Sequence, residues 1–418
     1  MPARRALLIT ENAPVPSDRR VWNEARALRD AGWEVTVLCA QGETRHRAEH
    51  EVLEDIAIHR FPLAPAAGGL LGYAREYGQA LWRIRRLARR LARERPFDVV
   101  HAGNPPDFLL LAVRSLKRQG TRFVFDHHDL VPELYRSKFG GGTGLMYRVA
   151  SALERIAFRS ADVVVCTNDS YRALALGRGG RRPEDVFVVR NGPDLERFRP
   201  VAPDPALKRG RAHLIGYLGI MGPQDGVDHA LRALAALKAR RDDWHAVLIG
   251  DGESLPAMKE LTAELALEDH VEFAGWRYDD DIRAILSTCD VCLAPDPPSP
   301  LNDVSTMIKI PEYLAMGAAV ASYDLVESRI SAAGAAEYAT PGDPEALGAA
   351  VDRLLDDPER RAAMAAAGQA DVRDRLAWQH QVPPLLAAYD RALDARPAAP
   401  GRAAATRASW WPWRAAGS

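Results

Sequence analysis

The sequence contains no long apolar run. No segment reaches about 18 consecutive apolar residues, so we expect no transmembrane helix. The first ten residues lead directly into a strand-like run and lack a small-residue cleavage site, so we expect no signal peptide. Only four cysteines occur in 418 residues, which favours a cytoplasmic protein with reduced thiols.

Patterns typical of metal sites are also scarce. Cys289 and Cys292 form a Cys-x-x-Cys pair, but no second cysteine pair accompanies it, so a buried structural role is expected rather than zinc or redox chemistry. The acidic run Asp279–Asp281 stands directly before a helical pattern, where carboxylates stabilise the N-terminal end of a helix. We therefore expect no metal site.

The composition is that of an ordinary globular enzyme. A chain of 418 residues has room for two or three domains of about 100–200 residues each. The net charge of −1 hides an asymmetry, because residues 1–200 contain 33 basic and 24 acidic residues and the remainder contains 22 basic and 32 acidic residues. We expect the basic half to approach an anionic surface, and we expect no nucleic-acid partner.

Short apolar runs alternate with helical patterns along the chain. This alternation predicts parallel sheets with helices on both faces. Buried strands are expected in two series, separated by the Pro-rich polar residues 190–211. The first series is RALLIT, WEVTVLCA, FDVVHAG, TRFVFDHH, DVVVCTN and DVFVVRN, and the second is HLIGYLG, WHAVLIGDG, HVEFAGW, DVCLAPD and AAVASYD. We therefore predict an α/β protein with two doubly wound domains.

The stretch DVSTMIKIPEYLAMGAAV, residues 303–320, combines polar residues with a short helical pattern. Proline is tolerated in a first turn, which predicts a helix from about Lys309 to Met316, ended by Gly317. The preceding loop, Val304–Ile308, would then lead to a helix N-terminus, where free N–H groups and the helix dipole favour an anion such as a diphosphate.

Four side chains of this stretch are candidates for binding such a ligand. Ser305 and Thr306 offer hydroxyl groups, and Lys309 offers a compact positive charge. Glu312 either complements the helix dipole or accepts two hydrogen bonds from the vicinal hydroxyls of a ribose.

At this point the sequence resembles a known family. PEYLAMGAAV resembles the end of the E-x7-E signature of the family 4 glycosyltransferases, in which the second glutamate, here Glu312, binds the ribose of a nucleotide-sugar donor. The first glutamate contacts the transferred sugar, and Val304 stands in its place. Further segments resemble the family in the same order: DRRVWNEARALRDAGWEVTVLC, HAGNPPDF, FDHHDLVPEL, RNGPDLERFRP, GYLGIMGPQDGVDHALRAL, LIGDGES, VEFAGW and AWQHQ.

The resemblance implies a GT-B fold, in which two Rossmann-like domains face each other across a cleft. Residues 1–200 are then the acceptor-side domain, residues 201–376 bind the donor, residues 377–395 form a helix that packs back toward the first domain, and residues 396–418 are a flexible tail. It also implies sugar transfer with retention of anomeric configuration, with a nucleotide-diphosphate sugar as donor and without a metal or other cofactor.

The expected donor site departs from the family pattern in one loop. That loop usually carries an arginine and a lysine that neutralise the diphosphate, and here Ile220 and Asp225 occupy their places. We expect backbone N–H groups near Gly219–Gly222 and the ammonium group of Lys309 to replace these charges. The predicted donor-binding residues are Gly219, Gly222, Gly250, Gly252, Ser305, Thr306, Met307, Lys309 and Glu312.

The sequence Asp126-His127-His128-Asp129 is the second focus. Neighbouring residues of a strand face opposite sides, so His127 and His128 are not expected to hold a metal together. The resemblance aligns His128 with a histidine beside the donor sugar, and the predicted catalytic residues are therefore His128 and Asp129. The predicted acceptor-side residues are Arg19 and Arg20, which stand near the place of the family's glycine pair, and Asn104, His127 and Glu133.

Residues 75–95 contain eight arginines and two glutamates. Their apolar residues share one helical face, which fits either a helix packed on the first domain or a basic amphipathic helix at an anionic membrane surface. Because many members of the family act on lipid-linked acceptors at the cytoplasmic leaflet, we predict peripheral membrane contact. The apolar residues are Tyr77, Leu81, Ile84, Ala88 and Leu91.

The predicted function is that of a retaining glycosyltransferase that builds a polysaccharide on a lipid carrier. One alternative is another GT-B enzyme of sugar nucleotides, such as an epimerase. A second is a non-catalytic nucleotide-binding paralogue, which Val304 and Asp225 make worth testing. The tryptophans at 410, 411 and 413 lie either in a passive tail or at a membrane surface.

Overall fold

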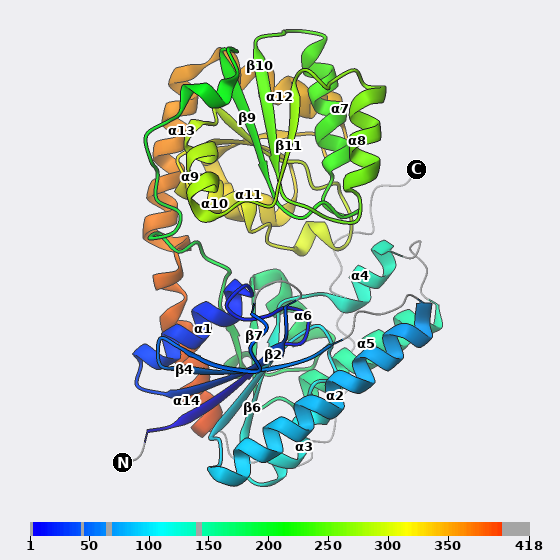
Figure 1. The fold of residues 1–418 in the computed structure, drawn as a ribbon, viewed down its shortest axis with the longest axis vertical. Helices are drawn as coiled ribbons and strands as arrows, with labels where there is room; N and C mark the ends of the chain where they lie inside the picture. The colour runs from blue at the N-terminus through cyan, green and yellow to red at the C-terminus, as the bar shows by residue number, and fades with distance from the viewer. Residues whose placement is uncertain (1–2, 43–45, 64–68, 139–143, 395–418) are drawn as a thin grey trace.

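Two parallel sheets, each covered by helices, build the protein (Figure 1). The computed structural model describes residues 3–42, 46–63, 69–138 and 144–394, so the Trp-rich tail lies outside the described residues. The first sheet has eight strands in the order β3-β4-β2-β1-β5-β6-β7-β8, and the second has six in the order β11-β10-β9-β12-β13-β14. Every strand pair is parallel except β3 with β4. The two predicted doubly wound α/β domains are confirmed.

The first domain begins with β1, whose five residues are all buried and which pairs with β2 on one side and β5 on the other. The strand order therefore reverses at β1, and loops at this point commonly bind ligands. The strands are β1 (Arg5–Ile9), β2 (Glu34–Ala40), β3 (His50–Leu53), β4 (Ile56–Phe61), β5 (Val99–Gly103), β6 (Arg122–His127), β7 (Val163–Cys166) and β8 (Val186–Val188). The helices are α1 (Arg19–Asp30), α2 (Gly69–Glu94), α3 (Leu110–Arg118), α4 (Val131–Lys138), α5 (Leu145–Ser160) and α6 (Asp169–Gly177).

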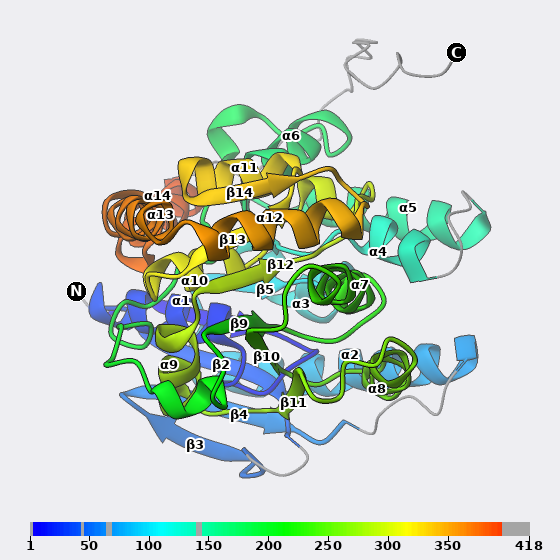
Figure 2. The same cartoon turned by 90° about the horizontal axis from the view of Figure 1, so that it is seen from above.

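The second domain repeats this plan around β9. Helices α7 and α12 pack on one face of its sheet, and α9 and α10 pack on the other (Figure 2). The strands are β9 (His213–Leu218), β10 (Trp244–Ile249), β11 (Val271–Gly275), β12 (Val291–Ala294), β13 (Ala319–Tyr323) and β14 (Ala336–Ala339). Its helices are α7 (Val227–Lys238), α8 (Leu255–Glu264), α9 (Asp279–Thr288), α10 (Lys309–Ala315), α11 (Val326–Ala332), α12 (Pro344–Asp356) and α13 (Pro358–Asp371), and α14 (Val382–Asp394) follows and belongs to the first domain.

All the strands expected from apolar runs are present, and three further strands were not expected. The hairpin of β3 and β4 lies at the edge of the first sheet, where β3 has no buried residue and so gives a weak apolar signal. Strand β14 has the sequence AEYA, which has a low β-propensity and is stabilised by pairing with β13.

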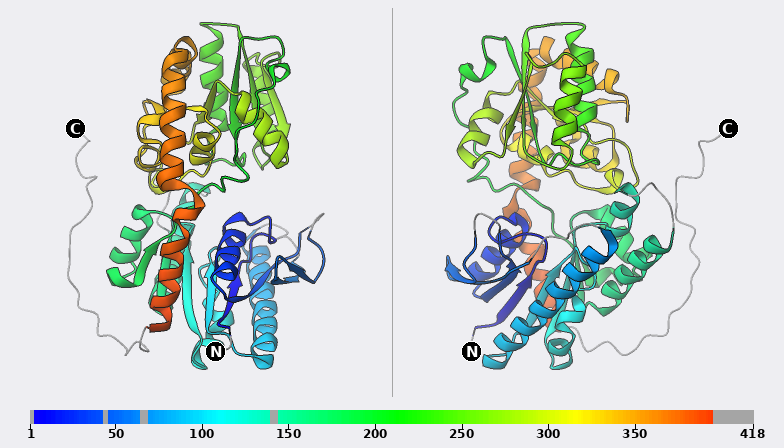
Figure 3. Two further views of the ribbon diagram at one scale, coloured as in Figure 1. Left: turned by 90° about the vertical axis from the view of Figure 1, so that its left-hand side faces the viewer. Right: turned by 45° about the vertical axis from the view of Figure 1, so that its right-hand side comes forward.

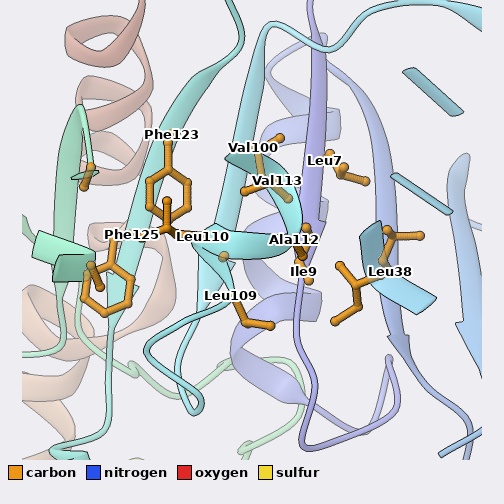
Figure 4. Close-up of a cluster of buried hydrophobic side chains, with 14 of the residues drawn as sticks. Leu7, Ile9, Leu38, Val100, Leu109, Leu110, Ala112, Val113, Phe123 and Phe125 are labelled. Carbon is orange, nitrogen blue, oxygen red and sulfur yellow. The ribbon is translucent and has the colours of Figure 1, made fainter. Parts of the chain in front are cut away.

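The core of the first domain explains why its strands read as continuous apolar runs. Leu7 and Ile9 of β1 lie in one cluster with Val100 of β5 and with Phe123 and Phe125 of β6, and α3 covers them (Figure 4). Burying each such side chain contributes about 1.5–3 kcal/mol to folding, so both faces of the sheet must be covered.

Helix α2 uses its apolar face inside the domain. Ala80, Ile84, Ala88 and Leu91 are buried in the core, whereas the arginines are intermediate or exposed. The apolar face that would enter a membrane surface is therefore already covered, as in a helix packed on the first domain. None of the described helices is long and apolar enough to cross a membrane.

The chain returns from the second domain to the first through α13, a π-helical turn at Val372–Leu376, and α14 (Figure 3). The N–H of Trp378 donates to the carbonyl of Pro193 over 3.0 Å. Gly192 is required beside this crossing, because a Cβ there would lie 2.1 Å from the carbonyl oxygen of Leu376. Helix α14 then packs on β5–β8, on the sheet of the first domain.

Candidate active site between the two domains

A cavity of about 560 Å³ lies between the two domains, and residues of both domains and of the returning chain line it. Eight of the predicted site residues are among the lining: Arg19, Arg20, His128, Asp129, Ser305, Thr306, Met307 and Glu312. The other eight are not: Asn104, His127, Glu133, Gly219, Gly222, Gly250, Gly252 and Lys309. The cavity therefore joins the His128 and Glu312 regions of the sequence in one place.

His128 is held at the cavity by a buried carboxylate. Its Nδ1 lies 2.9 Å from Oδ2 of Asp126, and only 13% of its side chain is exposed. Arg20 donates to both oxygens of Asp126 over 2.7 Å, which keeps this carboxylate an acceptor. Nδ1 of His128 must therefore carry the proton, and Nε2 is left for the cavity.

The opposite charges of Asp126 and of its partners Arg20 and His128 stabilise one another. Burial opposes a charged imidazole, but Asp126 outweighs burial and raises the pKa of His128 to about 9. Burial also opposes a charged carboxyl, yet Arg20 and His128 hold the pKa of Asp126 well below its usual value. Glu24, fully buried 3.4 Å from Arg20, has its pKa raised by burial. His128 is thus expected to be a cation at neutral pH.

Glu24, His101 and Asp126 lie close enough to hold a metal ion, but their surroundings fit an arginine instead. Arg20 already bonds both oxygens of Asp126. Nδ1 of His101 is 2.9 Å from the hydroxyl of Tyr389 on α14, which ties the cluster to the returning helix. No cofactor chemistry is assigned to this cluster.

His127 faces away from the cavity, as strand alternation predicts. Its Nε2 lies 3.1 Å from Oε1 of Glu154, and the ring packs against Phe158 in the core. Glu133 is likewise occupied, because both its oxygens accept from Arg178. Neither His127 nor Glu133 lines the cavity, and their assignment to the acceptor side stays a prediction.

Asn104 does not line the cavity but holds the loop that carries His128 and Asp129. Its Oδ1 accepts from the N–H groups of His128 and Asp129 over 2.9 and 3.0 Å, and its Nδ2 donates to the carbonyl of Asp129 over 2.7 Å. Gly103 has no room for a Cβ, which would lie 2.8 Å from Cε1 of His128. The end of β5 therefore fixes the position of His128.

Ser305 and Thr306 contact the first domain as well as the cavity. The hydroxyl groups of Tyr171 and Ser305 lie 3.0 Å apart. Asn168 donates from Nδ2 to the hydroxyl of Thr306 over 2.9 Å and to the carbonyl of Val304 over 2.8 Å. These hydroxyl groups, which were predicted to bind the donor, hold the two domains together here.

Glu312 presents a carboxyl group without a hydrogen-bond partner among the described residues. It lines the cavity on α10. Burial raises its pKa to about 7, although the neighbouring charges of Arg197 and Arg19 oppose this. An unbonded carboxylate facing a polar cavity can accept hydrogen bonds from a ligand's hydroxyl groups.

Lys309 does not line the cavity, and its charge is paired inside the second domain, so its predicted contact with the donor stays a prediction. Its Nζ forms an ion pair with Oδ1 of Asp296 at 2.7 Å, and the side chain is 8% exposed. The ammonium group also lies 5.0 Å from the ring centre of Tyr217. Helix α10 has only seven residues, so its dipole adds little to anion binding.

The predicted donor-site glycines pack loops against each other. A Cβ on Gly250 would lie 1.8 Å from the carbonyl oxygen of Gly219, and one on Gly252 would lie 2.5 Å from that of Met221. Gly222 donates its N–H to Asp225 over 3.0 Å. None of these glycines lines the cavity, although their loop places Ile220 there, 64% exposed.

Two important residues were missed from the sequence. Asp126 was considered only as a metal ligand, although it anchors both Arg20 and His128. Arg197 lies in the segment RNGPDLERFRP, for which only the family resemblance was noted, yet it lines the cavity together with Glu312. In the sequence, Asp126 stands out only as a polar residue inside an apolar strand. No sequence feature indicated a role for Arg197.

Comparison with known proteins agrees with this architecture. The profile of Glycosyltransferase Family 4 matches residues 17–197, and that of Glycosyl transferases group 1 matches residues 212–357. A 2-deoxystreptamine glucosyltransferase of Streptomyces kanamyceticus is 28% identical over 60% of this chain, and the match spans 65% of that relative. A D-inositol 3-phosphate glycosyltransferase of Stackebrandtia nassauensis is 25% identical over 93% of this chain and 89% of its own length.

Solved structures share the fold at low sequence identity. A sucrose-phosphate synthase of Thermosynechococcus elongatus has a TM-score of 0.78 and 17% identity, and the alignment covers 94% of this chain and 100% of that one. The Anabaena protein HepE in complex with UDP-glucose has a TM-score of 0.68 and 19% identity, with 92% and 99% covered.

Two parallel α/β domains with a shared polar cavity are the architecture of a GT-B protein. The chain belongs to the glycosyltransferases, with a family 4 first domain and a group 1 second domain, and the predicted resemblance is confirmed.

Proposed function

We propose that the protein transfers a sugar from a nucleotide-diphosphate sugar to an acceptor bound against the first domain. The main observation behind this proposal is that the unbonded carboxyl group of Glu312 and the imidazole of His128 line the same cavity. Related GT-B structures have been solved with UDP or UDP-glucose, which supports a nucleotide sugar as donor.

The residues suggest a division of roles. Ionised Glu312 accepts two hydrogen bonds from the ribose hydroxyl groups. His128, held protonated by Asp126, donates from Nε2 to an oxygen of the transferred sugar or of the leaving group, where negative charge develops. Asp129 lines the same cavity, and its proposed role is to contact the acceptor.

We further propose that transfer retains the anomeric configuration, as expected from the family resemblance. Val304, which stands in the sequence at the place of the family's first glutamate, offers no carboxylate. The catalysis expected from these residues is therefore positioning of the two substrates and stabilisation of the leaving diphosphate.

The experiment is to incubate the enzyme with UDP-, GDP- and ADP-sugars and a panel of lipid-linked and free acceptors. Acceptor-dependent release of nucleoside diphosphate, with the anomeric configuration of the product read by NMR, supports the proposal. Isomerised sugar nucleotide without transfer would show an epimerase instead. Donor binding without hydrolysis or transfer would show a non-catalytic paralogue.

The lipid-linked acceptor and the peripheral membrane location are proposals of the same kind. Because the apolar face of α2 is buried, contact would be electrostatic, through its exposed arginines and Trp82, which is 59% exposed. Flotation with vesicles of 30% anionic lipid, at roughly 0.1 M salt where charges are moderately screened, tests it. No flotation, or flotation unchanged in Arg85→Glu/Arg86→Glu, would contradict membrane contact through α2.

A further inference from the structure

Four arginines line the cavity in the described part of the chain: Arg19, Arg20, Arg26 and Arg197. Two of them are already neutralised. Arg20 bonds both oxygens of buried Asp126. Arg26 lies 3.0 Å from a carboxylate oxygen of Glu54 and 3.7 Å from one of Asp194. Arg20 and Arg26 each lie within ion-pair distance of two carboxylates, so they have little charge to offer to a ligand.

Arg19 and Arg197 share a single carboxylate oxygen. Nη2 of Arg19 lies 3.7 Å from Oδ1 of Asp279, and Nε of Arg197 lies 2.8 Å from the same atom. Burial and the repulsion of Arg197 lower the pKa of Arg19. In the described ion pairs, Asp279 is the one carboxylate that serves both guanidinium groups, so both keep N–H donors for an anionic ligand in the cavity.

The two guanidinium groups come from different parts of the fold. Arg19 is the first residue of α1 in the first domain, and Arg197 lies in the segment between β8 and β9. The side chain of Arg19 is 51% exposed and that of Arg197 is 22% exposed, so both are accessible from the cavity. Both line the same cavity as Glu312, and their charges oppose the rise of its pKa on burial.

The donor-domain loop offers no comparable charge. Its Ile220 is apolar and 64% exposed, and its Asp225 is acidic. Lys309 is neutralised by Asp296. A diphosphate bound beside Glu312 would therefore find its cations in Arg19 and Arg197.

We propose that Arg19 and Arg197 form a clamp on the diphosphate of the donor, so that the charge of the leaving group is neutralised from the first domain and the interdomain segment. This inference rests on the proposed function. It changes the predicted role of Arg19, which the sequence placed on the acceptor side. It also means that the bound donor bridges the two domains, because Arg19 and Glu312 belong to different domains.

The test compares ligands that differ in the diphosphate alone. Binding of UDP, GDP, ADP and dTDP, and of the matching nucleosides, is measured by calorimetry or NMR titration on the full chain. The variants are Arg19→Ala, Arg197→Ala and Arg197→Lys. The matched control is Arg283→Ala, because Arg283 has the same 22% exposure, pairs with Asp280 on α9 and does not line the cavity.

Arg19→Ala and Arg197→Ala are each expected to weaken nucleoside diphosphate binding roughly ten- to a hundredfold, the usual range for a charge-assisted hydrogen bond. Nucleoside binding and the Arg283→Ala variant should stay at the wild-type value, and Arg197→Lys should recover part of the loss. Unchanged diphosphate affinity in both alanine variants, or an equal loss for nucleosides, would overturn the clamp. If wild-type protein binds none of the four diphosphates, the proposed function fails instead.

Discussion

Nδ1 of His128 lies 2.9 Å from Oδ2 of Asp126, and Arg20 holds the same carboxylate from the other side. This relationship fixes both the tautomer and the charge of the histidine. A histidine without such a partner titrates near pH 6.5, whereas Asp126 raises the pKa of His128 to about 9 despite burial. The protein therefore presents a cationic ring to the cavity over the whole neutral range.

The first prediction concerns the pH dependence of activity. If the charged ring is required, activity falls as pH rises through about 9. In Asp126→Asn the fall should move toward pH ~6.5, with a lower maximal rate. The control is Glu154→Gln, which removes the carboxylate partner of His127, the other buried histidine of β6. This variant should lower stability but leave the pH at which activity falls unchanged. A fall that stays near pH 9 in Asp126→Asn would contradict the role of Asp126.

The second prediction concerns Glu312. Its pKa of about 7 lies above that of a free glutamate, so its neutral form is favoured in the fold. The corresponding stability is present below about pH 4.5 and is lost as pH rises through about 7. Glu312→Gln should therefore stabilise the ligand-free protein at pH 8 by about 1–3 kcal/mol and raise the KM for the donor. Urea unfolding and donor kinetics check the two effects.

For this variant, a donor KM equal to that of wild type would exclude Glu312 as the ribose ligand. A useful control is Glu260→Gln, which changes an exposed acid on α8 of the same domain that does not line the cavity. That variant should alter neither the donor KM nor stability at pH 8 by more than about 0.5 kcal/mol.

The third prediction concerns Lys309. Because its ion pair with Asp296 is buried, Lys309→Met leaves a carboxylate without its partner and should cost about 3–5 kcal/mol of stability. The double variant Lys309→Met/Asp296→Leu should recover most of this loss. Denaturant unfolding of the two variants measures it. Donor affinity that falls more than tenfold in a stable double variant would restore a direct role for Lys309.

The fourth prediction concerns the contact between the domains. Tyr171→Phe removes the hydrogen bond to Ser305, and Asn168→Ala removes those to Val304 and Thr306. Each bond contributes about 0.5–1.5 kcal/mol, so the double variant should favour a more open arrangement. Small-angle X-ray scattering should show a larger radius of gyration, which donor binding then reduces. An unchanged radius would show that other contacts hold the domains.

The sequence by itself determined the two α/β domains and the family. Buried parallel strands must be apolar on both faces, so each appears as a short continuous apolar run, and the order of the loops after those runs carries the family resemblance. Strands β3 and β14 were not predicted, because exposed or alanine-rich residues do not form a continuous apolar run. The glycine that ends α10 and the carboxylate of Glu312 could also be located, since both depend on local sequence.

Only the tertiary structure decided which charges are available. Lys309 is neutralised by Asp296, thirteen residues away, and Arg20 by Asp126, over a hundred residues away. Arg19, Arg197 and Asp279 belong to three separate segments of the chain, and both arginines contact Asp279 only in the folded protein. A charge is free or paired according to what lies within a few ångströms of it, and the sequence does not record such distances.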